Sequence, residues 1–124
     1  MNKNKNILVV DDDVDLCNSI VSALHRDGFR PTGVTTAREA IFKLKNQKYD
    51  CLILDMRLEN ETGEEVIEVI RHRKDSQNAS TPIIVVSGYL DKPLLVQVAK
   101  DIQAALVKPF ELSKLLETVK KHVS

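Results

Sequence analysis

The chain has 124 residues, of which 43% are hydrophobic and 29% are charged, and its 18 basic and 18 acidic residues give a formal net charge of zero at pH 7. This length suits one domain with a buried core and is too short for two. We therefore expect residues 1–124 to form a single domain, with residues 1–5 as a polar tail and no output domain. A balanced net charge also excludes an overall field that would hold the chain on nucleic acid or on an anionic membrane.

Two further features concern the compartment in which the chain works. No apolar run approaches the roughly 18 residues of a membrane span, and residues 1–6 lack the apolar core of a signal peptide. We expect a cytoplasmic protein that neither enters a membrane nor binds nucleic acid directly. The two cysteines, Cys17 and Cys51, lie in apolar patterns without CxxC or metal-ligand spacing, which predicts buried, reduced thiols with no chemical role.

Short apolar runs alternate along the chain with apolar stripes of helical spacing. The runs predict strands at residues 7–10, 30–34, 51–54, 83–86 and 104–107. The second run is interrupted by Pro31 and Gly33, so it fits only the edge of a sheet. The stripes predict helices around residues 14–24, 40–44, 66–70, 94–102 and 112–123. Polar loops are expected between the third strand and the third helix, and at residues 72–81.

Several predicted helix boundaries carry residues that favour them. Gly28 follows the first stripe, where a glycine C-cap is expected. Thr36 and Glu39 have the spacing of a capping box, and Pro93 fits the first turn of the fourth helix. Five strands that alternate with five helices in one short chain imply a doubly wound α/β domain, with a parallel sheet and right-handed crossovers.

Polar residues follow four of the predicted strands. Asp11 and Asp12 follow the first strand, Asp55 the third, Ser87 the fourth and Lys108 the fifth. In a doubly wound sheet, the ligand site lies outside the carboxyl ends of the strands, near the point where the strand order reverses. We therefore expect these residues to converge in one shallow pocket of three carboxylates, one hydroxyl and one ammonium group.

The charges of this predicted pocket restrict what it can hold. Two carboxylates at ~4 Å repel each other by about 4 kcal/mol in an effective dielectric of about 20. Lys108 supplies one positive charge, which leaves an acidic excess that suits a hard cation such as Mg²⁺. A bound Mg²⁺ attracts a phosphoryl group, and Asp55 is the candidate nucleophile that would attack its phosphorus to give an acyl phosphate.

These motifs carry a resemblance that covers essentially the whole chain. An acid pair ends the first strand, Gly63 lies eight residues after Asp55, Ser87 is followed by Gly88, and Lys108 begins a Lys-Pro-Phe sequence. The set, in this order and on these strand ends, resembles the response-regulator receiver domains of two-component signalling. The resemblance implies a flavodoxin-like sheet with the strand order 2-1-3-4-5. It also implies a phosphoacceptor switch that is not a true enzyme.

The resemblance further implies partners and residue roles. Asp55 would accept a phosphoryl group from a histidine kinase or a histidine phosphotransfer protein. Phosphorylation would shift the face built from the last two strands and last two helices, and this face would bind an unnamed downstream protein. Ser87 would follow the phosphoryl oxygens, Lys108 would pair with them, and the Lys108–Pro109 peptide bond would be cis. The implied Mg²⁺ ligands are Asp12 and Asp55 directly, Asp11 through water, and the backbone carbonyl of Arg57.

Two positions depart from the family pattern. A proline often stands four residues after the phosphoacceptor, and Glu59 at this position predicts a changed loop shape with unchanged chemistry. An aromatic switch residue usually stands three residues before the lysine, and here Ala105 removes the usual partner of the serine. We hypothesise that Tyr89, two residues beyond Ser87, replaces it. Arg57 and Tyr89 also flank the expected path of attacking water, which predicts a long-lived acyl phosphate.

Two alternatives from other classes stay open. The first is a Mg²⁺-dependent phosphohydrolase that resembles the haloacid dehalogenases, because Asp11 and Asp13 have the Asp-x-Asp spacing of their first strand. Against it, that family needs further acids after its lysine, and only Glu111 and Glu117 follow here, both expected in the last helix. Asp13 and Asp15 also fit better as the N-cap and first-turn acids of a helix. The second alternative is a degenerate receiver that acts as a constitutive interaction module.

Overall fold

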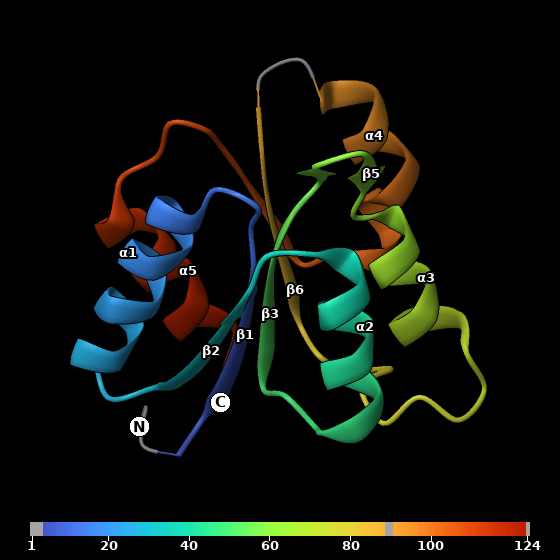
Figure 1. Cartoon of the computed structure of the whole chain (residues 1–124), viewed down its shortest axis with the longest axis horizontal. Helices are drawn as coiled ribbons and strands as arrows, with labels where there is room; N and C mark the ends of the chain where they lie inside the picture. Colours follow the sequence, from blue (N-terminus) through green and yellow to red (C-terminus); the bar gives the residue numbers. More distant parts are fainter. Residues whose placement is uncertain (1–3, 89–90, 124) are drawn as a thin grey trace.

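The fold is a three-layer arrangement in which helices cover both faces of a central sheet (Figure 1). The computed structural model describes residues 4–88 and 91–123. Five parallel strands form the sheet in the order β2-β1-β3-β6-β7. Their bounds are Asn6–Val10 (β1), Arg30–Val34 (β2), Cys51–Asp55 (β3), Ile83–Ser87 (β6) and Ala104–Val107 (β7). This is the predicted order 2-1-3-4-5, with β6 and β7 as its last two strands, so the expected fold class is confirmed.

Within residues 4–88 and 91–123, five α-helices cover the sheet. They are α1 (Val14–Arg26), α2 (Ala37–Asn46), α3 (Glu64–His72), α4 (Lys92–Val98) and α5 (Leu112–His122). Helices α1 and α5 lie on one face, and α2, α3 and α4 lie on the other (Figure 1). The change of face occurs between β1 and β3, which are neighbours in the sheet. The carboxyl ends of these two strands therefore meet at the switch point, where ligand sites form in this class of fold.

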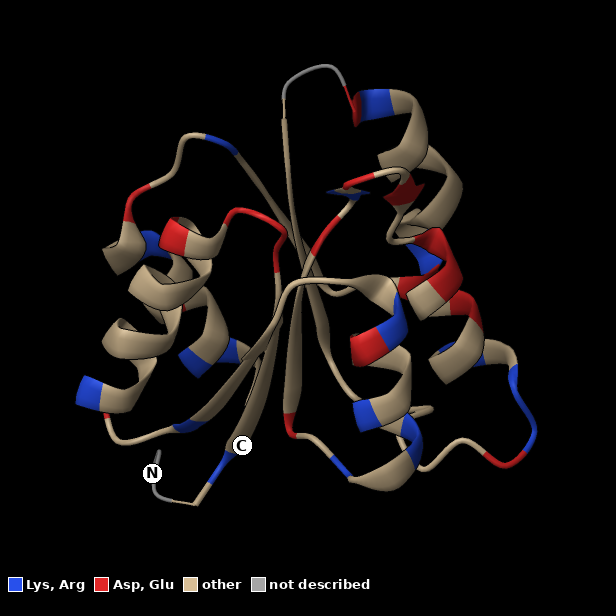
Figure 2. Ribbon diagram, in the orientation of Figure 1, with Lys and Arg blue, Asp and Glu red and all other residues tan. Residues whose placement is uncertain are grey.

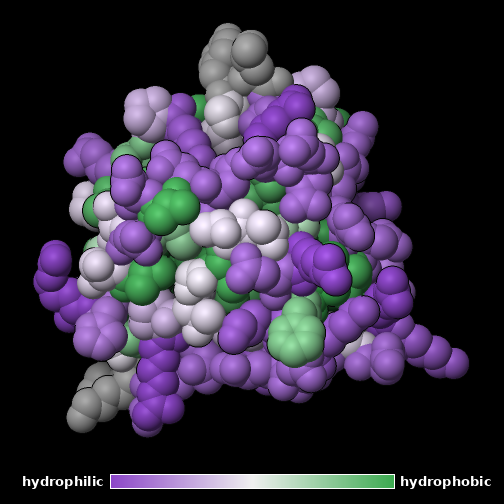
Figure 3. Space-filling model, viewed as in Figure 1, coloured by the Kyte–Doolittle hydropathy of each residue, from purple (hydrophilic) through white to green (hydrophobic). Residues whose placement is uncertain are grey.

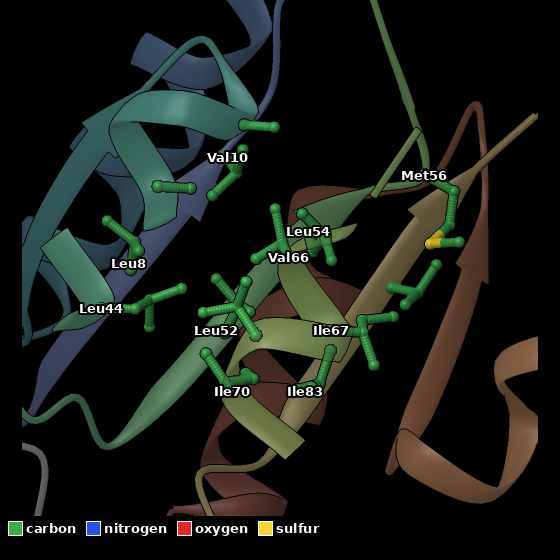
Figure 4. Packing of buried hydrophobic residues seen from close by; sticks show 14 of the residues in the cluster. Leu8, Val10, Leu44, Leu52, Leu54, Met56, Val66, Ile67, Ile70 and Ile83 are labelled. Carbon is green, nitrogen blue, oxygen red and sulfur yellow. The ribbon is translucent and has the colours of Figure 1, made fainter. Parts of the chain in front are cut away.

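The core has two parts, one on each side of the sheet. Leu8 and Val10 of β1 belong to the cluster beneath α2, α3 and α4, whereas Ile7 and Val9 belong to the cluster beneath α1 and α5. All four side chains are completely buried, as predicted for a strand covered on both faces. Figure 4 shows how the first cluster interlocks residues of β1, β3, α2 and α3. Each large aliphatic side chain buried in this way contributes about 1.5–3 kcal/mol to stability.

The outer surface has the opposite character. The face seen in Figure 3 is mostly hydrophilic, with hydrophobic residues in small, separate patches. Among the described residues, no helix combines the length and the apolar character that a membrane crossing requires. Cys17 and Cys51 are free and buried, as predicted, and burial raises the pKa of the Cys51 thiol to about 12.

Three of the predicted helix boundary signals have the expected geometry. The Asp13 side chain accepts a hydrogen bond from the backbone N–H of Leu16 at 3.1 Å, which makes it the N-cap of α1. The Thr36 hydroxyl accepts one from the N–H of Glu39, also at 3.1 Å, at the start of α2. Gly28 follows α1 with φ of 94°, a left-handed conformation that favours glycine.

Two predicted boundaries are wrong. The polar loop expected after β3 contains a small antiparallel hairpin of β4 (Arg57–Leu58) and β5 (Glu61–Thr62), closed by Asn60 with φ of 62°. Helix α4 does not reach Ile102, because the short 3-10 turn η2 (Ala99–Asp101) ends it and residue 102 is already extended. Ile102 still packs against the core, so its apolar character reflects burial and not helix membership.

One buried amide fixes the loop that leads into β6. The Asn78 side chain donates to the carbonyls of Leu44 at 2.7 Å and Gln47 at 2.9 Å. Its oxygen accepts from the N–H of Tyr49 at 2.8 Å and from the hydroxyl of Thr81 at 2.9 Å. These bonds join the end of α2 and the start of β3 to the loop, and so set where β6 begins.

Candidate functional site

Three acids meet at the carboxyl edge of the sheet. Asp11 and Asp12 follow β1, and Asp55 is the last residue of β3; Figure 2 shows acidic residues at the ends of both strands. Each of the three offers a carboxylate oxygen, and these oxygens all lie within 4.8 Å of one another. Asp11 and Asp55 are buried, with 1% and 3% of their surface exposed, whereas Asp12 is half-buried. The predicted convergence of the three carboxylates is therefore present.

Lys108 brings the counter-charge to this cluster. Its ammonium nitrogen lies 2.9 Å from Oδ2 of Asp55 and 3.1 Å from Oδ2 of Asp11. The backbone N–H of Lys108 donates to the carbonyl of Ser87 at 2.7 Å, which anchors the end of β7 to the end of β6. The Lys108–Pro109 peptide bond is cis. One lysine thus joins residues that lie 97 and 53 positions away along the chain.

The backbone around Asp55 is held by the turn that follows it. The N–H of Arg57 donates to Oδ1 of Asp55 at 3.0 Å, and the N–H of Gly63 donates to the carbonyl of Met56 at 2.9 Å. A Cβ atom on Gly63 would lie 3.0 Å from the carbonyl oxygen of Asp55 and 3.1 Å from the Leu54 side chain. Gly63 is therefore required for space, because the chain after the hairpin passes directly over Asp55.

Burial and charge act in opposite directions on the protonation of this cluster. Burial raises the pKa of Asp55 to about 6, although the hydrogen bonds from Lys108 and from the Arg57 N–H oppose the rise. Burial lowers the pKa of Lys108, but its hydrogen bonds and charge interactions with Asp55 and Asp11 outweigh burial, so the net pKa is raised. Lys108 is therefore a stable cation at neutral pH, and Asp55 is largely ionised there.

Ser87 ends β6 beside this cluster. Its side chain is completely buried, and its hydroxyl oxygen has no hydrogen-bond partner among the described residues. A buried hydroxyl without a partner is costly and uncommon. The hydroxyl therefore has free hydrogen-bonding capacity at the edge of the sheet where the carboxylates meet.

The sequence did not indicate the role of Asp91. This residue is 4% exposed; Oδ2 accepts from the N–H of Gly88 at 2.9 Å, and Oδ1 accepts a hydrogen bond from Nε of Arg57. Its position just before Pro93 is typical of a helix N-cap, yet it forms no side-chain cap bond on α4. Its cation partner lies 34 residues away, in the β4–β5 hairpin, and no local pattern predicts such a pair.

Of the remaining predicted residues, one lies beside the cluster, several lie apart from it, and one is outside the described residues. Tyr89 lies outside the described residues, so the proposed substitution of its ring for the missing aromatic stays a hypothesis. Ala105 is exposed on β7, and Glu59 is exposed in the hairpin turn. Asp13 caps α1 and is not among the clustered acids. Arg57 lies beside Asp55, as its predicted role requires.

The donor set fits a hard divalent cation. Asp11, Asp12 and Asp55 offer carboxylate oxygens, which are the ligands that Mg²⁺ prefers. Burial of two of these acids also makes their mutual repulsion costly, and a cation relieves it. The residues present are therefore suited to Mg²⁺.

Comparison with known proteins identifies the family. Residues 7–120 match the response regulator receiver domain. Among curated relatives, the transcriptional regulatory protein ZraR of Klebsiella oxytoca is 26% identical over 119 residues, which are 95% of this chain and 26% of ZraR. The acid tolerance regulatory protein ActR of Rhizobium meliloti (strain 1021) is 34% identical over 86 residues, 69% of this chain and 42% of ActR. The chain thus spans between a quarter and a half of these two relatives.

Solved structures agree with this assignment. A CheY-like receiver domain protein from Methanospirillum hungatei JF-1 has a TM-score of 0.85 at 27% identity, covering 96% of this chain and 93% of that chain. The response regulator TrrA of Thermotoga maritima, solved in complex with Mg²⁺-BeF, has a TM-score of 0.82 at 28% identity, covering 96% of this chain and 99% of that chain. The chain belongs to the response regulator receiver domains of two-component signalling, which are phosphoacceptors rather than true enzymes.

Proposed function

We propose that this domain is a phosphoacceptor switch in which Asp55 takes a phosphoryl group from a phosphohistidine donor. The observation that carries the proposal is the environment of Asp55. It ends a buried strand, its carboxylate contacts the Lys108 ammonium at 2.9 Å, and Asp11 and Asp12 offer oxygens within 4.8 Å. A nucleophilic carboxylate, a fixed cation and an oxygen-rich metal site are the parts that phosphoryl transfer to an acid requires.

The positions of these groups support the following transfer step. A carboxylate oxygen of Asp55 attacks the phosphorus of the phosphohistidine, a P–O bond forms, the P–N bond breaks, and the histidine nitrogen keeps the electron pair. Lys108 then faces the added negative charge, since its ammonium group already contacts Asp55. The hydroxyl of Ser87, which has no hydrogen-bond partner among the described residues, would donate to a phosphoryl oxygen.

We assign a Mg²⁺ site to the acid cluster. Its ligands would be the carboxylates of Asp12 and Asp55, Asp11 through water, and the backbone carbonyl of Arg57. When bound, Mg²⁺ supplies positive charge that offsets the phosphoryl oxygens. The complex of the similar regulator TrrA with Mg²⁺-BeF supports this assignment.

The family supports a proposal for the partners. Receiver domains pair with histidine kinases, and we propose a histidine kinase or a histidine phosphotransfer protein as the donor. A downstream protein would read the face built from β6, α4, β7 and α5. We also propose that residues 1–124 act as one cytoplasmic receiver domain without direct nucleic-acid contact.

The phosphohydrolase alternative finds less support. It would use Asp11 as nucleophile and Asp13 as acid, but the Asp13 side chain is engaged as the N-cap of α1. The two acids after Lys108 are also not placed as metal ligands. Glu111 precedes α5, and Glu117 pairs with Lys114 on the exposed surface of that helix. The degenerate receiver finds less support, because the three carboxylates, the Ser87 hydroxyl and the Lys108 ammonium group are all present at the predicted strand ends.

One experiment separates these functions. The protein is incubated with acetyl phosphate and Mg²⁺, and the labelled residue is mapped by mass spectrometry. We expect one phosphate on Asp55, with loss of labelling in Asp55→Asn and full labelling in Asp13→Asn, which keeps an N-cap oxygen on α1. Steady turnover of acetyl phosphate that depends on Asp11 and Asp13 but not on Asp55 would support the hydrolase, and absence of any labelling would support the degenerate receiver.

A further inference from the structure

An ion pair bridges two loops beside the phosphoacceptor. Arg57 in the β4–β5 hairpin donates from Nε to Oδ1 of Asp91, at the start of α4. We call this contact the Arg57–Asp91 bridge. Arg57 lies two residues after Asp55, and Asp91 lies four residues after Ser87. The bridge therefore connects the chain that follows β3 to the chain that follows β6.

Asp91 depends strongly on this bridge. Its side chain is only 6% exposed, and both of its oxygens are used, one by Arg57 and the other by the Gly88 N–H at 2.9 Å. A carboxylate buried to this extent is costly without a counter-charge, and the exposed guanidinium of Arg57 supplies one. Among the described residues, Arg57 is the cation that contacts it. Loss of Arg57 would therefore force Asp91 and the start of α4 to rearrange.

Arg57, in contrast, is free to change partner. Its side chain is 62% exposed, and within the described residues its terminal guanidinium nitrogens form no hydrogen bond. Its backbone N–H is bonded to Oδ1 of Asp55, which keeps the root of the side chain beside the phosphoacceptor. A phosphoryl group on Asp55 would bring about two negative charges and three acceptor oxygens to this position, and guanidinium binds such groups in a bidentate fork.

We propose that phosphorylation of Asp55 draws the Arg57 guanidinium from Asp91 to the phosphoryl oxygens, and that Asp91 and the start of α4 then shift. This inference rests on the proposed function, and it gives the contact through which phosphorylation would affect α4. Movement of the Arg57 guanidinium from Asp91 to the phosphoryl group would affect α4 without an aromatic residue at position 105, where this chain has alanine. Asp91 is a positioning residue in this scheme, because it competes with the phosphoryl group for Arg57.

Because Asp91 and the phosphoryl group compete for Arg57, the effect of Asp91→Asn on binding should depend on the presence of Arg57. The probe is beryllofluoride with Mg²⁺, an analogue of the phosphoryl group, titrated into wild type, Asp91→Asn, Arg57→Gln and the double variant. Asp91→Asn keeps an oxygen for the Gly88 N–H but removes the charge that holds Arg57. We expect it to tighten beryllofluoride binding about tenfold in the wild-type background, the value of one charged hydrogen bond. In the Arg57→Gln background, the same change should alter binding by less than about twofold.

A second readout does not depend on affinity. In the free Asp91→Asn and Arg57→Gln variants, the methyl NMR signals of Leu94, Leu95 and Val98 on α4 should move toward the positions they take in beryllofluoride-bound wild type. Arg57 is exposed, so its variant reports even where Asp91→Asn folds poorly. The matched control is the ion pair between Lys120 of α5 and Asp27, the residue after α1, where Lys120→Gln should change neither readout.

The outcomes distinguish this inference from the function beneath it. Equal effects of Asp91→Asn in both backgrounds, or α4 signals that stay in place, overturn the exchange of Arg57 while Asp55 can still be a phosphoacceptor. Failure of wild type to bind beryllofluoride, together with no label on Asp55 from acetyl phosphate, overturns both proposals.

Discussion

The ammonium nitrogen of Lys108 lies 2.9 Å from Oδ2 of Asp55, although the two residues are 53 positions apart in the sequence. The contact exists because β3 and β7 run parallel and end at the same edge of the sheet, with β6 between them. A fixed positive charge at the proposed nucleophile is more valuable for charge that develops during transfer than for the resting carboxylate. Lys108 should therefore affect phosphorylation more than folding.

Replacement of Lys108 by glutamine tests this view. The change removes the charge but keeps a side chain of similar length, so phosphorylation of Asp55 by acetyl phosphate should slow by about 100-fold. The rate is measured by mass spectrometry of the intact protein over time. Lys114→Gln, at an exposed position on α5, is the control and should retain the wild-type rate. A Lys108→Gln rate within about twofold of wild type would contradict the role of the ammonium group.

The pKa of Asp55 predicts how stability changes with pH. Burial raises this pKa from 3.8 to about 6, so the folded state holds the proton more tightly than the unfolded chain. The stabilising contribution of that proton is complete below pH 3.8 and is lost as the pH rises through about 6. Asp55→Asn has no such proton. Its stability relative to that of wild type should therefore rise by about 2 kcal/mol as the pH increases from about 4.5 to about 7.5.

Urea unfolding in EDTA measures this difference at each pH. EDTA keeps divalent cations away from the acid cluster, so the comparison concerns the protein groups themselves. Asp75→Asn, in an exposed loop, is the control and should follow wild type across the range. If the stability gap between Asp55→Asn and wild type stayed constant with pH, the raised pKa would be refuted.

Much of the site was predictable because it depends on strand ends. Parallel strands bring their carboxyl ends to one edge, so Asp11, Asp12, Asp55 and Lys108 could be placed together from the order of the elements. The acid cluster, the strand order and the buried strand at residues 7–10 follow from such patterns. The family resemblance supplied the residue roles, which geometry does not reveal.

What the sequence missed depends on contacts between loops. Asp91 lies next to Arg57 because β3 and β6 pair in the sheet, and no local sequence pattern around either residue predicts this contact. The β4–β5 hairpin has two residues in each strand, too few for any alternating pattern. Ile102 was assigned to α4 because its apolar side chain suited the helical stripe, but its packing against the core explains the same character outside the helix.

The buried network of Asn78 predicts a large stability effect far from the acid cluster. Its side chain makes the four hydrogen bonds described above, and alanine would remove all of them, including those to the Leu44 and Gln47 carbonyls and to the Tyr49 N–H. Asn78→Ala should lower the free energy of unfolding by about 2–4 kcal/mol, measured with urea. Gln77→Ala, an exposed neighbour with one bond to the Lys45 carbonyl, should cost about 0.5 kcal/mol or less. Similar losses for both variants would show that the network is not the cause.

Gly63 offers a test of the packing over Asp55. An added Cβ would lie 3.0 Å from the Asp55 carbonyl oxygen and 3.1 Å from the Leu54 side chain, closer than ordinary contacts. Gly63→Ala should therefore lower the unfolding free energy by about 1–3 kcal/mol in urea denaturation. Gly88→Ala is the matched control, because its Cβ would meet the Asp91 carboxylate at an ordinary 3.7 Å. A Gly63→Ala protein as stable as the control would mean that the hairpin moves aside without cost.

The affinity of the acid cluster for Mg²⁺ can be tested independently of phosphorylation. Asp12 contributes to the group of three carboxylates, whereas its neighbour Asp13 is engaged as the N-cap of α1. Asp12→Asn removes a full charge from the donor set, so the affinity for Mg²⁺ should fall by about tenfold or more. Asp13→Asn makes the same chemical change one residue away, keeps the capping oxygen, and should bind Mg²⁺ as wild type does. Calorimetric titration with Mg²⁺ measures both, and equal losses in the two variants would mean that general negative charge, and not this cluster, attracts the cation.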